Sequence, residues 1–283
     1  MPHIEELITS KQNALVVETA KLADRKHRRA SGLFRFDGVK LAEEALRSNA
    51  PLTAILLHEQ RAQAVLSRFE EAGLFLPDGA RTVCLSDAVF RRLSEENAPE
   101  GIICVCQEMP IHQLKQVPVI SERERIVLLE SVRDPSNLGA IIRSAAAFGV
   151  DHLIISEDCA DIYNAKTVRA SMGTLFTQRL TRVANITDAI AALRAAGRRT
   201  FAAALDRDAW QLGSFAVQSG DCVVIGNEGH GLSAQTIAAC DHSVFIPMTA
   251  RAESLNAAVA ASVLMWAFGA PNSDERQGGM NDV

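Results

Sequence analysis

Hydrophobic and polar residues form two successive series along the chain. In the first series, residues 11–107, short apolar runs predict strands, and longer segments with apolar positions three or four residues apart predict helices. The predicted helices span 11–29, 38–48, 61–72 and 87–93, and the predicted strands span 33–36, 53–58, 82–85 and 102–106. Short strands that alternate with helices indicate a compact α/β sandwich, which we take as a first domain over residues 1–107.

A second series follows residues 108–125, whose prolines and mixed charge indicate a linker. Its predicted strands span 126–129, 153–155, 200–204, 222–225 and 243–246, and its predicted helices span 138–148, 187–196, 233–239 and 255–268. Runs such as IVLLE and CVVIG are apolar almost throughout, which is typical of a parallel sheet covered on both faces. We therefore expect a second α/β domain over 126–270 and a flexible tail over 271–283.

Composition narrows the class of protein. A chain of 283 residues with 48% hydrophobic content can build two cores. It contains neither a continuous apolar run long enough to span a membrane nor an apolar signal sequence at its start, so we expect a soluble, cytoplasmic protein. The six cysteines include no CxxC pair, and Cys104 and Cys106 fit buried positions of one strand, so we expect reduced thiols and no metal.

Charge is distributed unevenly. The net charge is −5, yet residues 21–40 contain seven basic and two acidic side chains. The basic residues of this window are Lys21, Arg25, Lys26, Arg28, Arg29, Arg35 and Lys40. Such a patch is either a solvated helix face or a surface that contacts phosphates, and the charge pattern alone leaves both open.

Ligands of open parallel sheets bind beyond the carboxyl ends of the strands, so the loops after three predicted strands are candidate site elements. After IVLLE, we expect Asn137 to cap the next helix. On that helix the predicted buried stripe is Ile141, Ile142, Ala145 and Phe148. Arg143 lies off this stripe, where it can reach an anion near the helix start. An ordinary cap followed by an exposed arginine is the alternative interpretation.

The loop after CVVIG is rich in glycine, with Gly226, Gly229 and Gly231 around Glu228. Glycines at a strand end let the backbone approach a ligand closely, although a tight turn alone has the same composition. The spacing is not the dinucleotide-binding GxGxxG, which would follow the first strand. His230 occupies the same loop, and we expect it to be exposed to solvent.

In the third loop, Ser254 and Asn256 precede an alanine-rich helix. One side chain suffices to cap a helix, so the other is available for a different role.

The stretches PSNLGAIIRSAAAFG, VVIGNEGHGLS and IPMTARAESLNAAVAASVL, in this order, resemble the three signature motifs of the SpoU (TrmH-like) branch of the SPOUT RNA methyltransferases. The first domain also resembles the L30e-like substrate-binding domain of many members, through FRFDGVKLAEEAL. The chain departs from the common pattern at Ala257 and Ala258, and because relatives vary at Asn227 we assign that residue no role.

The resemblance implies a parallel-sheet domain with a deep trefoil knot, one of the rare exceptions to unknotted folds, and a homodimer packed through it. It implies S-adenosylmethionine as cofactor, with contacts from Gly226, Ile246 and Leu255. It also implies the active-site residues Asn137, Arg143, Glu228, Ser254 and Asn256.

The reaction that the resemblance implies is methyl transfer to a ribose 2′-hydroxyl, and the L30e-like domain favours ribosomal RNA as the substrate. A guanidinium rarely releases its proton, so we expect Arg143 to grip a phosphate and Glu228 to hold Arg143 or its loop. Asn137, Ser254 and Asn256 would then orient the nucleotide. The basic residues of 21–40 become a candidate RNA-contacting surface.

Four alternatives stay open at this stage. The chain could methylate the ribose of a transfer RNA, or it could be a SPOUT enzyme that methylates a base. It could instead be an inactive RNA-binding module, or a metabolic α/β enzyme, which would show no salt-dependent affinity for RNA.

Overall fold

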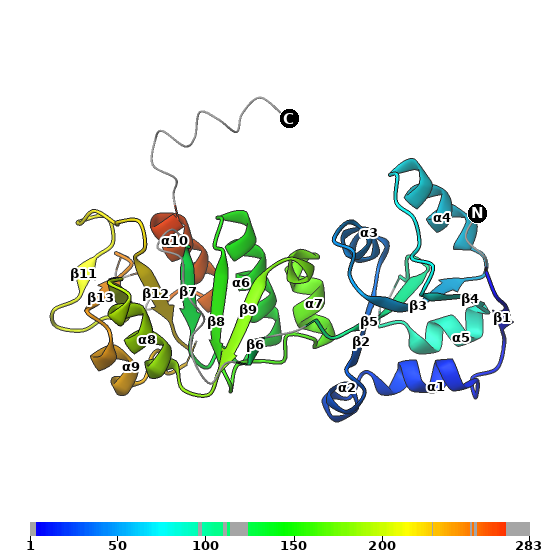
Figure 1. Ribbon diagram of the computed structural model, residues 1–283, viewed down its shortest axis with the longest axis horizontal. Helices are drawn as coiled ribbons and strands as arrows, with labels where there is room; N and C mark the ends of the chain where they lie inside the picture. Colours follow the sequence, from blue (N-terminus) through cyan, green and yellow to red (C-terminus); the bar gives the residue numbers. More distant parts are fainter. Residues whose placement is uncertain are drawn as a thin grey trace. The chain divides into compact units, whose positions relative to one another are not determined.

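The fold is described from a computed structural model, which covers residues 4–95, 98–109, 112–113, 124–227, 229–249, 251 and 254–269 (Figure 1). Contacts between Cα atoms divide the chain into two units. The first comprises Met1–Pro110 together with Asp161–Thr177, and the second comprises Ile111–Ala160 together with Gln178–Val283. None of the described helices has the length and apolar character needed to cross a bilayer.

The first unit contains a five-stranded mixed sheet with the order β1-β4-β3-β5-β2. Its strands are β1 (Leu7–Ile8), β2 (Leu33–Asp37), β3 (Leu52–His58), β4 (Arg81–Leu85) and β5 (Ile102–Gln107). Strand β5 runs antiparallel to both β2 and β3, whereas β4 runs parallel to β1 and β3. Cys104 and Cys106 are buried on β5 as predicted, and burial raises the pKa of Cys106 to about 12.

The helices of the first unit are α1 (Ala14–Lys21), α2 (Arg25–Ser31), α3 (Val39–Arg47), α4 (Ala62–Glu71), α5 (Asp87–Leu93), α7 (Ala165–Ser171) and the short 3-10 helix η1 (Thr174–Phe176). The prediction of one helix over 11–29 is wrong. The chain turns after α1, and the Asp24 side chain accepts a hydrogen bond from the Lys26 backbone N–H at 2.6 Å to begin α2. An aspartate with this capping role starts a new helix even where the flanking residues are good helix formers.

Segment 161–177 follows β8 in the chain, yet its side chains pack against the sheet of the first unit. Tyr163 stacks on Phe34 with ring centroids 4.5 Å apart, and Phe176 packs on Phe36 at 5.3 Å. The Tyr163 hydroxyl donates a hydrogen bond to the Met109 carbonyl oxygen at 2.8 Å. These aromatic contacts place α7 on β2, the strand at one edge of the sheet.

The second unit contains an eight-stranded sheet with the order β11-β13-β10-β12-β7-β8-β9-β6, and every neighbouring pair is parallel. Its strands are β6 (His112–Gln113), β7 (Ile126–Leu129), β8 (His152–Ser156), β9 (Arg179–Val183), β10 (Thr200–Ala203), β11 (Trp210–Gln211), β12 (Cys222–Ile225) and β13 (His242–Phe245). This is the parallel α/β domain that the apolar runs predict.

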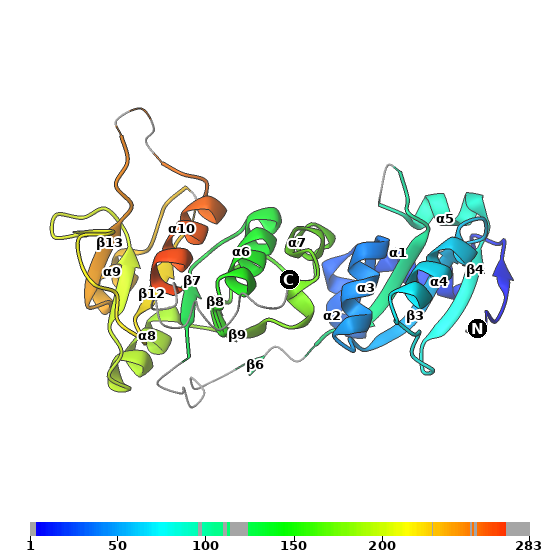
Figure 2. The same ribbon diagram turned by 90° about the horizontal axis from the view of Figure 1, so that it is seen from above.

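Among the described residues of the second unit, the helices are α6 (Pro135–Ala147), α8 (Ile186–Ala195), α9 (Ala234–Ala239) and α10 (Ala257–Gly269). Helix α10 packs against α6 and β12, whereas α8 packs against α9, β8 and β10 (Figure 2). Residues of β7 contribute to the buried cluster beneath α8 and α9 through Ile126 and Leu128, while the alternate residues Val127 and Leu129 are buried as well. Both faces of the sheet are therefore covered.

Strand β7 lies between β8 and β12 at the centre of this sheet. The chain leaves β7 through α6 to reach β8 on one side, and β12 lies on the other side. Such a change of direction opens a crevice at the carboxyl ends of the two central strands. The loops that follow β7 and β12 meet at this position.

Candidate active site

The loop after β7 leads directly into α6. The Asp134 side chain accepts a hydrogen bond from the Asn137 backbone N–H at 2.8 Å, so Asp134 is the residue that caps α6. The prediction that Asn137 caps this helix is therefore wrong. Pro135 is the first residue of α6, where its missing N–H costs nothing, and Asn137 lies two residues further along the helix.

Asn137 meets the third predicted motif. The Asn256 Nδ2 donates a hydrogen bond to the Asn137 Oδ1 at 3.0 Å. The Asn256 Oδ1 also accepts from the backbone N–H groups of Ala258 at 2.9 Å and Val259 at 3.3 Å, which caps α10. One amide thus caps α10 and joins it to the start of α6, and Ser254 is left uncommitted to capping.

Close packing of α10 on α6 holds this junction. The hydroxyls of Ser144 and Ser262 lie 2.8 Å apart across the two helices. At the other end of the contact, a Cβ on Gly269 would lie 2.9 Å from the Phe148 carbonyl oxygen, so that position requires a glycine. Small residues let the helices approach, and they bring Asn137 and Asn256 together across 119 positions of sequence.

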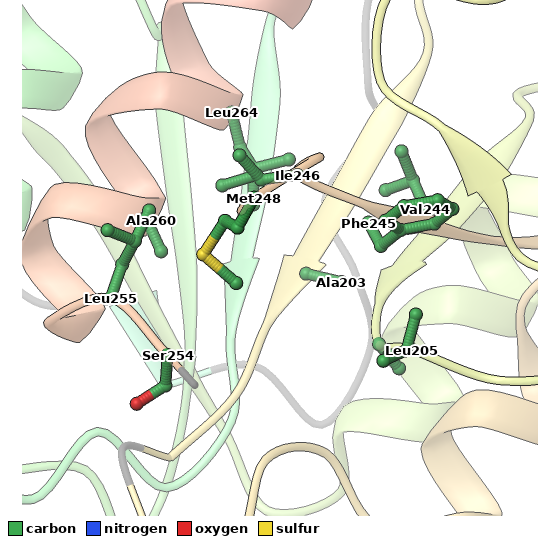
Figure 3. A pocket seen from close by; sticks show the side chains of 11 residues that line it. Ala203, Leu205, Val244, Phe245, Ile246, Met248, Ser254, Leu255, Ala260 and Leu264 are labelled. Atoms are coloured by element: carbon green, nitrogen blue, oxygen red, sulfur yellow. The ribbon is translucent and has the colours of Figure 1, made fainter. Parts of the chain in front are cut away.

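A cavity of about 290 Å³ lies beside this junction, at the carboxyl ends of β10 and β13 (Figure 3). Ser254, Leu255 and Ile246, three of the predicted site residues, line it. The remaining lining residues are Ala203, Ala204, Leu205, Val244, Phe245, Met248, Ala260 and Leu264. The lining is mostly apolar with one hydroxyl at the edge, which suits an adenine ring or another flat apolar group better than a phosphate.

The cavity contains residues that the sequence did not identify. Ala203, Ala204 and Leu205 lie at the end of β10 and line the cavity. Neither their size nor their apolar character distinguishes them in the sequence as residues of a binding site. Knowledge that β10 pairs with both β12 and β13 would have identified them, since the ends of neighbouring parallel strands share one edge. That pairing is a property of the folded sheet and is absent from local pattern.

Gly226 has a structural role in the loop after β12. A Cβ on Gly226 would lie 2.4 Å from the Gly231 carbonyl carbon, so the loop closes on itself at this glycine. Asn227 and Gly231 exchange both backbone hydrogen bonds, at 3.1 and 3.0 Å. Gly226 does not line the cavity described above. The glycine that was predicted for close approach to a ligand is required first for close approach within its own loop.

The other predicted active-site residues differ in what the structure describes. Arg143 is exposed on α6, six residues after Asn137, and it forms no ion pair with any described residue. Its guanidinium is therefore available to an anionic ligand. Glu228 lies outside the described residues. His230 is exposed, as predicted.

A carboxylate with a strongly lowered pKa lies next to the loop after β7. Burial alone would raise the pKa of Asp158, but hydrogen bonds from Ser131, Ser156 and Arg133 lower it to about 2. The donors lie at 2.5, 2.6 and 2.9 Å from its oxygens. Asp158 is thus a fixed anion that ties the loop after β7 to the loop after β8, and its proton is not available for catalysis near neutral pH.

The basic residues of 21–40 divide into exposed and buried groups. Lys21, Arg25, Lys26, Arg29 and Lys40 are exposed. Lys21 pairs with Glu18, Lys40 pairs with Glu44, and Arg25 lies 4.0 Å from Asp161. Lys26 and Arg29 form no ion pair within the described part of the chain.

Arg28 and Arg35 do not belong to that surface. Arg28 is 3% exposed and donates hydrogen bonds to the carbonyl oxygens of Leu22 and Ala23 and to Asp161 at 2.6 Å. Arg35 is 7% exposed and pairs with Glu95 at 2.8 Å. Both arginines join segments of the first unit, so we remove them from the candidate RNA-contacting residues.

Comparison with known families supplies independent information. Residues 124–266 match the model of the SpoU rRNA methylase family, and residues 13–104 match that of the MRM3-like substrate binding domain. The first match covers all described residues of the cavity and of the Asn137–Asn256 junction. The second match covers most of the first unit but excludes segment 161–177.

Two characterised relatives align over nearly the whole chain. A 23S rRNA (guanosine-2′-O)-methyltransferase of Bacillus subtilis is 31% identical, and the alignment covers 92% of this chain and 97% of the relative. A 23S rRNA (uridine-2′-O)-methyltransferase of Streptomyces viridochromogenes is 33% identical, covering 92% and 90%.

Solved structures agree with these sequence comparisons. A rRNA methyltransferase from Sinorhizobium meliloti with bound AdoMet superimposes with a TM-score of 0.79 at 27% identity, over 94% of this chain and 97% of that structure. The SpoU methyltransferase AviRb of Streptomyces viridochromogenes, also with AdoMet, superimposes with a TM-score of 0.77 at 30% identity, over 95% of this chain and all of that structure.

Proposed function

Because the chain belongs to the SpoU rRNA methylase family, we propose that it transfers a methyl group from S-adenosylmethionine to a ribose 2′-hydroxyl of ribosomal RNA. The observation that carries the proposal is the junction of Asn137 and Asn256 at 3.0 Å beside the cavity lined by Ser254, Leu255 and Ile246. Two motifs far apart in sequence meet there at the end of a parallel sheet, where such sheets bind ligands.

The apolar cavity fits S-adenosylmethionine, which supplies an electrophilic methyl group on a sulfonium when bound. Ile246 and Leu255 would contact its apolar parts, and Ser254, which also lines the cavity, would face the RNA. Asn137 and Asn256 would orient the ribose, because an amide offers both a donor and an acceptor to a sugar hydroxyl. Holding the hydroxyl in line with the methyl group is the main requirement of a displacement of this kind.

Arg143 is the residue that we assign to the RNA phosphate next to the target ribose. Its exposure and lack of an ion pair among the described residues leave its five donors available, and a guanidinium matches a phosphate in two-point geometry. The guanidinium is a poor base, so we assign it charge stabilisation and not proton removal. Glu228 is proposed to hold Arg143 or its loop.

Recognition of the RNA is assigned to the first unit. Lys21, Arg25, Lys26, Arg29 and Lys40 form the proposed contact surface, with Lys26 and Arg29 the least neutralised by neighbouring carboxylates. The relatives act on guanosine in one case and uridine in the other, so the shared chemistry concerns the ribose and not the base. This favours ribose methylation over base methylation, and ribosomal RNA over transfer RNA.

We further propose that the protein acts in the cytoplasm as a homodimer formed through α10 and that residues of the second unit form a trefoil knot. Helix α10 carries exposed apolar side chains at Val259 and Trp266, which are 49% and 58% exposed. These positions are seven residues apart and lie on one helix face, preceded by the 38% exposed Leu255. An apolar stripe of this kind is unfavourable in water and is suited to a partner surface.

The proposal is tested by incubating the purified protein with ribosomal RNA and S-adenosylmethionine and measuring 2′-O-methylated nucleosides. Arg143→Ala should lower kcat by a factor on the order of 100, and Arg143→Lys by about tenfold, because lysine offers one point charge in place of a fork. Arg92→Lys, a change at an exposed arginine of the first unit, is the control. Binding of S-adenosylmethionine without any methyl transfer would favour an inactive RNA-binding module.

A further inference from the structure

Two consecutive residues after β7 hold both ends of the loop that follows β12. Strands β7 and β12 pair in parallel up to Leu129 and Ile225, and the Glu130 backbone N–H continues the ladder to the Ile225 carbonyl oxygen at 2.9 Å. Beyond the ends of the two strands, side chains form the connection between the two loops. Glu130 contacts the far end of the β12 loop, and Ser131 contacts its near end.

The near end is organised by Asn227. Its Nδ2 donates a hydrogen bond to the Ser131 carbonyl oxygen at 2.8 Å. Its Oδ1 accepts from the backbone N–H groups of Gly229 at 2.8 Å and His230 at 3.2 Å. One amide therefore closes the turn from inside and fastens it to the loop that precedes Asn137.

The far end is held by the Glu130 carboxylate. It accepts hydrogen bonds from the Ser233 backbone N–H and hydroxyl, both at 2.9 Å, and from the Thr236 hydroxyl at 2.7 Å. Ser233 in turn caps α9 by accepting from the Thr236 N–H. Hydrogen bonds to a charged acceptor are stronger than those between neutral groups, so this carboxylate is a firm anchor.

Ser131 itself is held in an unfavourable conformation. Its φ of +56° is in the left-handed region, which a residue other than glycine adopts at a cost on the order of 1 kcal/mol. Its N–H donates to Ser156 Oγ at 2.8 Å, and its hydroxyl donates to Asp158. These contacts fix the direction of the carbonyl group that Asn227 uses.

We propose that Glu130 and Asn227 are positioning residues for methyl transfer. They set the position of the β12 loop relative to the loop that carries Asn137, and neither needs to touch the substrate. The inference rests on the proposed function and adds a role to two residues outside the predicted site. A displacement of about 1 Å between reacting groups lowers rates by up to 100-fold, so loss of either anchor should act on turnover.

The test uses Glu130→Gln, Asn227→Ala and Asn227→Asp in the full-length protein, with Glu157→Gln as the control. Glu157 is exposed, and its side chain forms no hydrogen bond or ion pair with a described residue. Asn227→Asp retains the acceptor for Gly229 and His230 but removes the donor to Ser131, so it separates the turn from its attachment.

We expect each of the three variants to lower kcat about tenfold or more, with KM for RNA within twofold of the wild type. A purely structural role would lower kcat only in proportion to the fraction of unfolded protein. The thermal midpoint of each variant is therefore measured together with its kcat, and kcat is measured again at a temperature 15 °C below that of the first assay. The inference is overturned if the wild type is active and each variant has a kcat within twofold of it. It is also overturned if the variants regain the wild-type kcat at the lower temperature. Absence of methyl transfer by the wild type instead refutes the proposed function.

Discussion

Replacement of Asn256 by alanine should affect stability and turnover through separate contacts. The side chain caps α10 through two backbone N–H groups and donates to Asn137. Loss of a cap costs about 1 kcal/mol and loss of one amide hydrogen bond about 1 kcal/mol, so Asn256→Ala should lower the free energy of unfolding by about 2 kcal/mol.

Asn137→Ala should leave the cap of α6 intact. Asp134 caps α6, so this variant retains the cap and loses the hydrogen bond with Asn256, which contributes about 1 kcal/mol. In a double-mutant cycle the coupling energy should be about 1 kcal/mol, because the two changes remove the same hydrogen bond. For a unit of this size, each kcal/mol corresponds to roughly 2–4 °C in Tm.

The assay is calorimetric or optical unfolding of the two single variants and the double variant, together with methyl-transfer rates at a temperature where all are folded. Both single variants should lose turnover by a factor on the order of 100 at that temperature. A coupling energy near zero would refute the assignment of the junction. A loss of turnover that follows stability alone would refute their role in orienting the ribose.

Three further predictions follow from single contacts. Gly226→Ala should destabilise the second unit by about 1–3 kcal/mol, because its Cβ would lie 2.4 Å from the Gly231 carbonyl carbon. An unchanged free energy of unfolding would contradict this and show that the loop can open freely. Arg28→Ala should cost about 2–3 kcal/mol, because it removes a buried side chain that bonds Asp161 and the carbonyl oxygens of Leu22 and Ala23. Arg29→Ala should retain stability and weaken RNA binding, and the reverse result in unfolding and filter-binding assays would contradict the surface assignment. The hydrogen bonds to the Asp158 carboxylate lower its pKa to about 2 in the folded state, so its contribution to stability is present above about pH 4 and is lost as pH falls toward 2. In acid titrations of the free energy of unfolding, Asp158→Asn should remove that part of the pH dependence. A titration curve of the variant parallel to that of the wild type would contradict the assignment.

The parallel sheet of the second unit could be predicted because its strands are apolar on both faces. Strand β9 was not predicted, since Arg179, Thr181 and Arg182 interrupt its apolar pattern near the edge of the sheet. The two-residue strand β11 is too short for any periodic signal. Strands near the edge of a sheet are less covered and need fewer apolar residues, so the pattern of apolar residues that predicts a strand is weakest there.

The residues of the site were predictable where a strand end or a motif marked them, as for Ser254, Leu255 and Ile246 in the cavity. Their partners were not. Asp134 and Asn137 are both suited to cap α6, and only the folded chain shows which one does. Likewise, a cluster of basic residues does not reveal that Arg28 and Arg35 are buried and paired with Asp161 and Glu95, because these carboxylates lie far away in sequence.

The most direct test of the account is the product of the reaction. Ribosomal RNA from cells that lack the protein is incubated with the purified chain and S-adenosylmethionine that carries an isotopic label in its methyl group, and digested nucleosides are identified by mass spectrometry. We predict label on the ribose of one nucleotide type, with loss of label in the Asn137→Ala and Asn256→Ala variants. Label on a base, or no label with a chain that binds the cofactor, would contradict it.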